Sequence, residues 1–260
     1  MYIVIKVLFL KLKKLKYKVN INLYNTIMLS KSYDEDKSVF EVGVDEAGRG
    51  PLFGRVYASA VVLPKGNTSF DFSKLKDSKK FHSKKKINEV ADYIKSNALF
   101  YSVTYADESV VDEINILQAT QKAMHDAIKE VISASDKELQ SYLLMIDGTY
   151  FNSLNVFNKR NKKIETIPHK CVQGGDNRYA SIAAASILAK VERDAYIDDL
   201  CIKYPFLSEH YSIDKNKGYG AKLHIEGINK FGITQWHRKT FGICKKYVKM
   251  NDVLVLGIFD

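Results

Sequence analysis

Residues 40–63 read FEVGVDEAGRGPLFGRVYASAVVL, two apolar runs joined by a short loop that contains several glycines. The runs at 40–46 and 55–63 are rich in valine, as β-strands are, and the loop is short enough to connect antiparallel neighbours. This stretch therefore predicts the first two strands of a sheet and their antiparallel pairing.

The first of these strands ends on two adjacent acids, Asp45 and Glu46, and the loop follows at once. A nucleotide-binding phosphate loop would have four residues between its glycines, followed by Lys-Ser or Lys-Thr. Here five residues separate Gly48 from Gly54, and Arg55 comes next, so that interpretation is excluded. Glycines that let a backbone approach a ligand, with an arginine beside them, are suited to holding a sugar-phosphate backbone.

Apolar spacing along the rest of the chain predicts strands in alternation with helices. The expected elements are helices at 83–97, 109–133 and 177–203, and strands at 98–106, 141–147 and 163–169. Ser83 is a candidate cap for the first helix. Strands first, then strands and helices in turn, predict an α/β fold with a mixed sheet and helices on its faces.

Composition narrows the class of protein. The chain has 260 residues, 46% of them hydrophobic, which is enough for a full core in one large domain. Lys and Arg number 40 against 30 acids, and this excess favours a polyanionic partner such as nucleic acid or an acidic membrane surface. Cys171, Cys201 and Cys244 form no CxxC pair, which argues against a zinc site or disulfide framework. We therefore expect a cytoplasmic protein.

Residues 1–38 form a basic N-terminal extension with eight lysines and three acids. Its apolar part, residues 2–10, precedes most of the lysines and is too short to span a bilayer, so neither a secretory signal nor a membrane span is expected. Two interpretations stay open. The extension is either disordered and dispensable for folding, with the domain starting near Met28, or a basic amphipathic surface segment. We favour the first.

Acidic residues occupy positions that the predicted sheet could bring together. Asp45 and Glu46 end one strand, Asp147 ends another, and Asp194 lies on the long helix. Converging carboxylates raise each other's pKa values unless a cation neutralises them, and Mg²⁺ or Mn²⁺ suits such an oxygen-only set. Two such ions about 4 Å apart are the usual arrangement of metal-dependent nucleases. Each acid alone, however, is better explained as a turn or surface residue, since Asp before Gly is a common turn signal.

Six blocks of the sequence together resemble the ribonuclease HII family. They are VDEAGRGPLFGRV, LKDSKKF, INILQATQKAM, MIDGTYF, GGDNRYASIAAASILAKVERD and NKGYGAKLHIEGINKFGITQWHRKTF, in the family's order. The resemblance implies a ribonuclease H-like mixed β-sheet flanked by helices, residues 39–205. A small helical C-terminal part that binds substrate, residues 206–260, is expected to follow.

The resemblance also implies a function. Members of the family hydrolyse the RNA strand of RNA–DNA hybrids and incise 5′ of a ribonucleotide embedded in duplex DNA, leaving a 3′-hydroxyl. Asp45, Glu46, Asp147 and Asp194 are thereby expected to be catalytic and to hold two Mn²⁺ or Mg²⁺ ions. One ion would activate a water and the other would stabilise the departing sugar oxygen. No small-molecule cofactor and no membrane are expected, and the enzyme is expected to be a monomer.

Several residues are assigned to the nucleic acid by the same resemblance. The segment Gly48-Arg49-Gly50 matches the part of the family that reads the ribose 2′-hydroxyl, the group that separates a ribonucleotide from its deoxy neighbours. Tyr219, in KGYG, matches the tyrosine that stacks at the following deoxynucleotide. Its alternative is an ordinary core tyrosine.

Other matched positions leave two interpretations open. Lys79 is either a phosphate contact or part of a solvated lysine run, and Asn115 either faces the minor groove or simply lies on a helix. Asp176 either assists the acids or caps the following helix. Two features depart from the family: Arg55 stands where proline is usual, and the basic segment 152–165 is longer than expected.

Two rival functions remain at this point. A junction resolvase of the same fold could use similar carboxylates on another substrate. A non-catalytic protein that binds hybrids would leave a ribonucleotide-containing duplex intact in the presence of metal. Cleavage of that duplex, but not of its all-DNA counterpart, distinguishes both rivals from a ribonuclease H.

Overall fold

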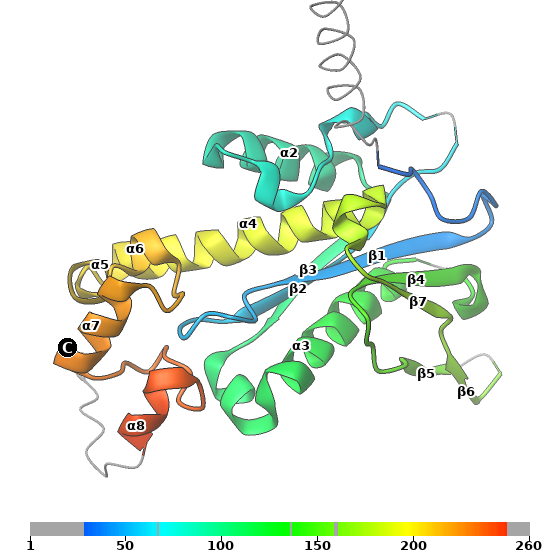
Figure 1. Ribbon diagram of the computed structural model, residues 1–260. Helices are drawn as coiled ribbons and strands as arrows, with labels where there is room; N and C mark the ends of the chain where they lie inside the picture. Colours follow the sequence, from blue (N-terminus) through cyan, green and yellow to red (C-terminus); the bar gives the residue numbers. More distant parts are fainter. Residues whose placement is uncertain (1–28, 67, 136, 159–160, 249–260) are drawn as a thin grey trace, which may run out of the picture.

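A five-stranded mixed sheet forms the centre of the computed structural model, which describes residues 29–66, 68–135, 137–158 and 161–248 (Figure 1). The strand order is β3 (Phe100–Ala106), β2 (Val56–Val62), β1 (Phe40–Ala47), β4 (Tyr142–Asp147) and β7 (His169–Val172). β2 runs antiparallel to β1 and β3, whereas β4 is parallel to β1 and to β7. The predicted mixed sheet and its antiparallel first pair are confirmed.

Three helices cover the sheet. α4 (Ala180–Lys203) crosses one face, α2 (Lys84–Asn97) packs on the outer side of α4, and α3 (Glu108–Ser133) lies on the opposite face (Figure 1). The first ten residues of α4, mostly Ala and Ser, are all buried, and the helix packs closely against β1. Ser83 caps α2 as expected, because its hydroxyl accepts a hydrogen bond from Lys86 N.

The hydrophobic core has a layer on each side of the sheet. Between the sheet and α3, Val42 and Leu144 pack against Ile128. Between the sheet, α4 and α2, Val61 packs with Ile94 among others. All five side chains are essentially without solvent exposure. Full burial of each aliphatic side chain contributes about 1.5–3 kcal/mol, which fixes the sheet and its helices as one unit.

A group of short helices follows α4 and lies at one end of it (Figure 1). Their bounds are α5 (Phe206–Tyr211), α6 (Ile213–Asn216), α7 (Lys222–Phe231) and α8 (Lys245–Val248). They share a separate apolar cluster with the end of α4, in which Ile197 and Ile228 are fully buried. Phe53, from the loop between β1 and β2, is buried in the same cluster. The C-terminal helices are therefore attached directly to that loop.

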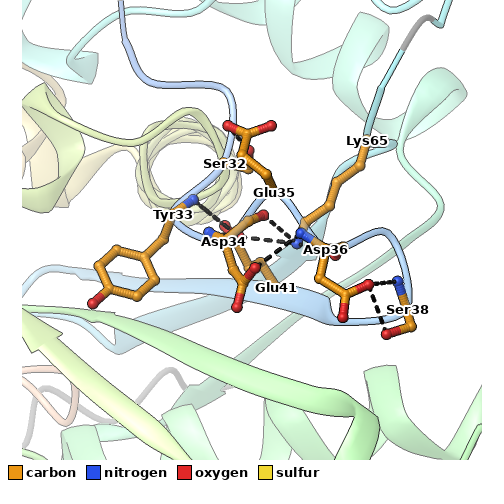
Figure 2. A network of polar contacts seen from close by, with 8 residues as sticks. All are labelled: Ser32, Tyr33, Asp34, Glu35, Asp36, Ser38, Glu41 and Lys65. Carbon is orange, nitrogen blue, oxygen red and sulfur yellow. Dashed lines mark hydrogen bonds and ion pairs between the residues drawn. The ribbon is translucent and has the colours of Figure 1, made fainter.

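The described part of the N-terminal extension, residues 29–38, is held against the domain by a polar network (Figure 2). The buried carboxylate of Glu41 accepts hydrogen bonds from the backbone N–H groups of Tyr33 (2.9 Å) and Asp34 (2.7 Å). Lys65 Nζ lies 3.0 Å from the same carboxylate and also donates to the Asp34 carbonyl. Residues 1–28, which carry most of the predicted extension, lie outside the described residues.

Two predicted boundaries are wrong. The single strand expected at 163–169 is split: β6 (Lys163–Thr166) pairs with β5 (Asn155–Asn158) in a separate two-stranded ribbon, and β7 joins the main sheet. Pro168 lies between them, and a proline lacks the N–H that a continuous strand would use. The long helix starts at Ala180 rather than at residue 177, because Gly175–Asn177 form a 3₁₀ turn.

The helix expected at 109–133 exists as α3 but is interrupted. Asn115 has φ 66° and ψ 164°, and its side-chain oxygen accepts hydrogen bonds from Leu117 N and Gln118 N. Asn115 therefore caps the second part of the helix. Among the described residues, no helix is both long enough and apolar enough to cross a membrane.

Candidate active site

Two neighbouring strands bring acidic residues to the same edge of the sheet. β1 and β4 are parallel and in register at Val44 and Ile146, so the residues that follow them, Asp45 and Asp147, lie side by side. Parallel strands end at the same edge, which is the physical reason for this placement. α4 crosses that edge and adds Asp194.

These acids face a cavity of about 320 Å³ that also receives residues from the loop after β1 and from the C-terminal helices. The cavity is lined by Asp45, Glu46, Ala47, Gly48, Ser78, Lys79, Asp147, Ser186, Lys190, Arg193, Asp194, Asn216, Lys217 and Tyr219. All four predicted acids therefore open onto one space, together with three of the six residues predicted to contact nucleic acid.

Burial and mutual repulsion shape the electrostatics of the acids. Burial raises the pKa of Asp45 well above its usual range, and the negative charges of Glu46 and Asp147 raise it further. The pKa of Glu46 is also raised by burial, although the Arg49 guanidinium offsets part of the rise. Burial likewise raises the pKa of Asp147, against a hydrogen bond from Gly175 N. A cation placed among these groups would remove the repulsion.

Each acid has a protein partner in the present conformation. Asp147 accepts a 2.6 Å hydrogen bond from Gly175 N, and Asp45 accepts one of 2.7 Å from Glu46 N. Glu46 forms an ion pair with Arg49 at 3.2 Å. Asp194 forms one with Lys190 at 2.9 Å. Across the described ranges, no three Asp, Glu, His or Cys side chains are grouped closely enough to hold a metal ion as they stand. The four acids therefore share the cavity, and each already has a contact within the protein.

Of the segment Gly48-Arg49-Gly50, only Gly48 lines the cavity, as does Tyr219, while Arg49 and Gly50 lie outside the lining. A Cβ atom added to Gly50 would lie 3.6 Å from Tyr219 Cε1, so the two segments are in near contact. Gly48 has φ +95°, and any Cβ there would overlap with the side chain of Arg193. The Tyr219 side chain is 51% exposed, which contradicts the alternative that it is a core tyrosine.

The remaining predicted nucleic-acid residues lie apart from one another. Lys79 lines the cavity and its Nζ is 3.5 Å from the buried Asp176 carboxylate. Asn115 is exposed on α3 and does not line the cavity. Asp176 does not cap α4, which has no side-chain cap, and accepts a hydrogen bond from Asn177 instead. The nucleic-acid roles of Lys79 and Asn115 stay predictions.

Sequence reasoning missed three basic residues of the cavity wall. Lys190 lies one helical turn before Asp194, and that spacing was the available signal. Arg193 is buried and donates to the Lys217 carbonyl at 2.8 Å. Lys217 in turn forms an ion pair with Asp198. No sequence pattern singles out Arg193 or Lys217, because their contacts join segments far apart in the chain.

Arg55, the residue that departs from the family's usual proline, lies outside the cavity lining. Its guanidinium carbon is 4.0 Å from the ring centroid of Tyr105 and 4.4 Å from that of Tyr196. Tyr196 donates a hydrogen bond to the buried Glu108. The charge of Arg55 is therefore accommodated between two aromatic rings. The basic segment 152–165 corresponds to the β5–β6 ribbon, which also lies outside the cavity lining.

A mixed sheet of this order, with acids at adjacent strand ends and a helix across one face, is the ribonuclease H-like fold, and solved structures agree. The crystal structure of ribonuclease H2 from Pyrococcus horikoshii OT3 matches with a TM-score of 0.57 and 21% identity, over 79% of this chain and 95% of that chain. A structure titled Bst-RNase HIII in complex with Mn²⁺ matches with a TM-score of 0.54 and 18% identity, over 74% and 70% of the two chains.

Sequence comparison defines the family within that fold. The family model Ribonuclease HII matches residues 42–244. Ribonuclease HII of Bacteroides thetaiotaomicron is 41% identical over 208 residues, covering 80% of this chain and 92% of that protein. Ribonuclease HII of Caldanaerobacter subterraneus subsp. tengcongensis is 42% identical over 211 residues, covering 81% and 77%. The chain belongs to the ribonuclease HII family. It is a type 2 ribonuclease H, an endonuclease that degrades the RNA of RNA–DNA hybrids with the help of divalent metal ions.

Proposed function

We propose that this enzyme also incises duplex DNA on the 5′ side of a single embedded ribonucleotide, leaving a 3′-hydroxyl, and that it holds two divalent ions while doing so. The observation that carries the proposal is the shared cavity. Its lining includes the four acids Asp45, Glu46, Asp147 and Asp194, and also Gly48 and Tyr219 from the two segments assigned to the sugar. Cleavage and sugar recognition would thus take place in one space.

The donor set fits hard divalent ions. The four acids supply only oxygen ligands, and the raised pKa values of Asp45, Glu46 and Asp147 come from burial and negative charge that cations would offset. Two Mg²⁺ or Mn²⁺ ions bound there would supply an activated water and neutralise the departing sugar oxygen. A ribonuclease HIII of the same fold was solved with Mn²⁺, which supports Mn²⁺ as one candidate.

Other residues would bind and orient the substrate. The exposed Lys79, at the cavity wall, is placed to contact a phosphate. The half-exposed ring of Tyr219 is placed to stack against a sugar or base. The Gly48-Arg49-Gly50 backbone would contact the ribose, because glycines at 48 and 50 present no side chain to a ligand.

Incision of matched duplexes tests the proposal. One duplex carries a single ribonucleotide, the second is the same sequence in DNA alone, and the third is an RNA–DNA hybrid. We expect cleavage of the first at the 5′ side of the ribonucleotide in Mn²⁺ or Mg²⁺, with a 3′-hydroxyl on the product, and no cleavage after metal is removed by EDTA.

The all-DNA duplex is the control, and it must stay intact. Cleavage of the hybrid without cleavage of the single-ribonucleotide duplex would contradict the proposal while leaving the ribonuclease H activity in place. Cleavage of the all-DNA duplex would contradict the assignment of sugar recognition to this cavity.

A further inference from the structure

Three segments that are distant in sequence are joined by backbone hydrogen bonds at the mouth of the cavity. They are the loop after β1, the turn that carries Tyr219, and the segment 234–238 after α7. Leu52 N donates to Gly218 O at 2.8 Å, which joins the loop to the turn. Arg238 N donates to Leu52 O at 2.8 Å, which joins the loop to the third segment. The loop is therefore joined directly to the Tyr219 turn and to the third segment.

The side chain of Arg238 occupies the inside of the loop and holds four of its carbonyl oxygens. Nε donates to Gly54 O at 2.8 Å, and Nη2 donates to Gly48 O at 2.6 Å. Nη1 donates to both Arg49 O at 2.9 Å and Pro51 O at 3.0 Å. The loop's own turns leave these carbonyls free to point inward, and Arg238 satisfies them.

Arg238 is completely buried, and within the described residues no carboxylate lies at ion-pair distance from its guanidinium. Burial lowers its pKa to about 10, so the side chain remains charged at neutral pH. Placing a charge in the interior without a direct ion pair is costly, and here the four carbonyl dipoles compensate it together with the more distant carboxylates of Glu108 and Asp112. Only arginine has a planar fork with enough donors to reach four carbonyls at once.

A second chain of hydrogen bonds runs from the same segment to Tyr219. Thr234 N donates to His237 Nδ1 at 2.9 Å, which leaves the proton of His237 on Nε2. His237 Nε2 lies 3.1 Å from His224 Nε2, and His224 Nδ1 lies 2.8 Å from the Tyr219 carbonyl. A carbonyl only accepts, so His224 must donate from Nδ1 and accept at Nε2. Both imidazoles are therefore neutral, and each has one fixed tautomer.

We propose that His237 and Arg238, with His224, are positioning residues for sugar recognition. Arg238 sets the shape of the Gly48–Gly54 loop, and the two histidines fix the backbone of Tyr219 opposite that loop. The inference rests on the proposed role of these two segments in reading the ribose 2′-hydroxyl. A hydroxyl is recognised only when its partners are held to within a fraction of an ångström, so recognition depends on residues that never touch the substrate.

The test measures preference for a ribonucleotide, which a purely structural role would not change. Binding is followed by fluorescence anisotropy in an Asp45→Asn background, where cleavage is expected to be absent. Two duplexes are compared, one with a single ribonucleotide and one of DNA alone. We expect Arg238→Lys, which keeps the charge but loses the fork, to lower the ratio of the two affinities by about tenfold, equivalent to about 1.4 kcal/mol.

Two further variants complete the design. His224→Phe keeps an aromatic ring among its aromatic neighbours but removes both hydrogen bonds, and it should also lower the ratio. Ile228→Ala removes fully buried apolar volume from the same C-terminal cluster but none of the hydrogen bonds made by Arg238, His224 or His237, and it should leave the ratio unchanged. Circular dichroism establishes that each variant is folded.

The outcomes separate this inference from the function on which it rests. If the Asp45→Asn reference shows no preference for the ribonucleotide, the proposed sugar recognition is wrong. If the reference clearly prefers the ribonucleotide duplex and folded Arg238→Lys keeps the same preference, the positioning role is wrong while the proposed sugar recognition stands. Should Arg238→Lys fail to fold, His224→Phe decides in the same way. An equal loss in Ile228→Ala would also overturn the inference, since general destabilisation would then explain the effect.

Discussion

Gly43 on β1 lies directly against the backbone of Ser181 at the start of α4, with no room for a side chain between them. This contact lets α4 lie on the sheet close to the strand that carries Asp45 two residues later. Asp45 then reaches Ser186, a residue further along the same helix. The close approach of strand and helix at Gly43 therefore helps to determine where the helix and its acid, Asp194, lie relative to Asp45.

Replacing Gly43 with alanine should destabilise the protein strongly. The added Cβ would overlap with backbone atoms of Ser181. The backbone of β1 and that of α4 cannot move aside as a flexible side chain can. We expect a loss of about 3 kcal/mol in the free energy of unfolding, measured by urea denaturation. Gly50→Ala is the control, since its nearest atom would be 3.6 Å away, and it should change stability by less than about 0.5 kcal/mol. Equal stability of the two variants would show that the contact is not tight.

Replacing Asp45 with asparagine should abolish cleavage and yet stabilise the metal-free protein. Loss of a catalytic carboxylate should lower kcat by at least about a thousandfold. The pKa of Asp45 is raised above its usual range in the folded state, so its ionisation at neutral pH lowers the free energy of unfolding. Asparagine does not ionise and therefore avoids this loss. The melting temperature of the variant without metal should therefore exceed that of the wild type at pH 7.

The pH dependence of that difference has a defined sign. A raised carboxyl pKa in the folded state means that the cost is full above the folded pKa, decreases as the pH falls below it, and disappears below the unfolded-state pKa. The two melting temperatures should therefore converge as the pH is lowered. Added Mn²⁺ should reverse the order at pH 7 by stabilising the wild type more than the variant. If Asp45→Asn were less stable than the wild type when both are free of metal, the inferred repulsion among the acids would be wrong.

Replacing Lys190 with methionine should strengthen metal binding. Lys190 Nζ lies 2.9 Å from Asp194 Oδ2 and competes with a cation for that oxygen. A partly exposed ion pair contributes about 0–1 kcal/mol, so the Kd for Mn²⁺ should fall by no more than about fivefold in calorimetric titration. Lys122→Met removes an equivalent i,i+4 pair with Asp126 on α3 and should leave the Kd unchanged. A similar change in both variants would point to net charge instead.

Replacing Arg55 with methionine should affect stability and spare cleavage. The guanidinium lies between the rings of Tyr105 and Tyr196, and two such contacts are expected to contribute about 1–2 kcal/mol together. Thermal unfolding measures this loss, while kcat/KM on the single-ribonucleotide duplex should stay within about twofold, because Arg55 does not line the cavity. Lys230→Met, at an exposed cation–π contact, should have little effect on either quantity. A large loss of kcat/KM would place Arg55 in contact with substrate.

Replacing Tyr219 with alanine should weaken substrate binding without unfolding the protein. The side chain is 51% exposed at the cavity, so little packing is lost. Loss of one stacking contact should cost about 1–3 kcal/mol of binding, measured by anisotropy in the Asp45→Asn background. Tyr219→Phe keeps the ring and should bind nearly as well as tyrosine. Weak binding by both variants would indicate that the hydroxyl, not the ring, is the essential group.

Much of the fold was predictable because its signals are local. Valine-rich runs identified β1 and β2, and helical spacing identified α2 and α3. The splitting of the predicted strand at 163–169 was not foreseen, because pairing of β6 with β5 and of β7 with β4 depends on contacts across the chain. The interruption of α3 at Asn115 was missed because the apolar periodicity continues through this residue, although asparagine is a common helix cap.

By itself, the sequence determined β1 to β4, the helices α2 to α4, the positions of the four acids on these elements, and the family. Those features follow from side-chain periodicity and from motifs that lie within single segments. Only the tertiary structure decided that Arg55 lies between two tyrosines and that Arg238 fills the loop beside Asp45. Arg238 is separated from Gly48 by 190 positions in the chain, so this contact arises from packing of the C-terminal helices and not from any local pattern.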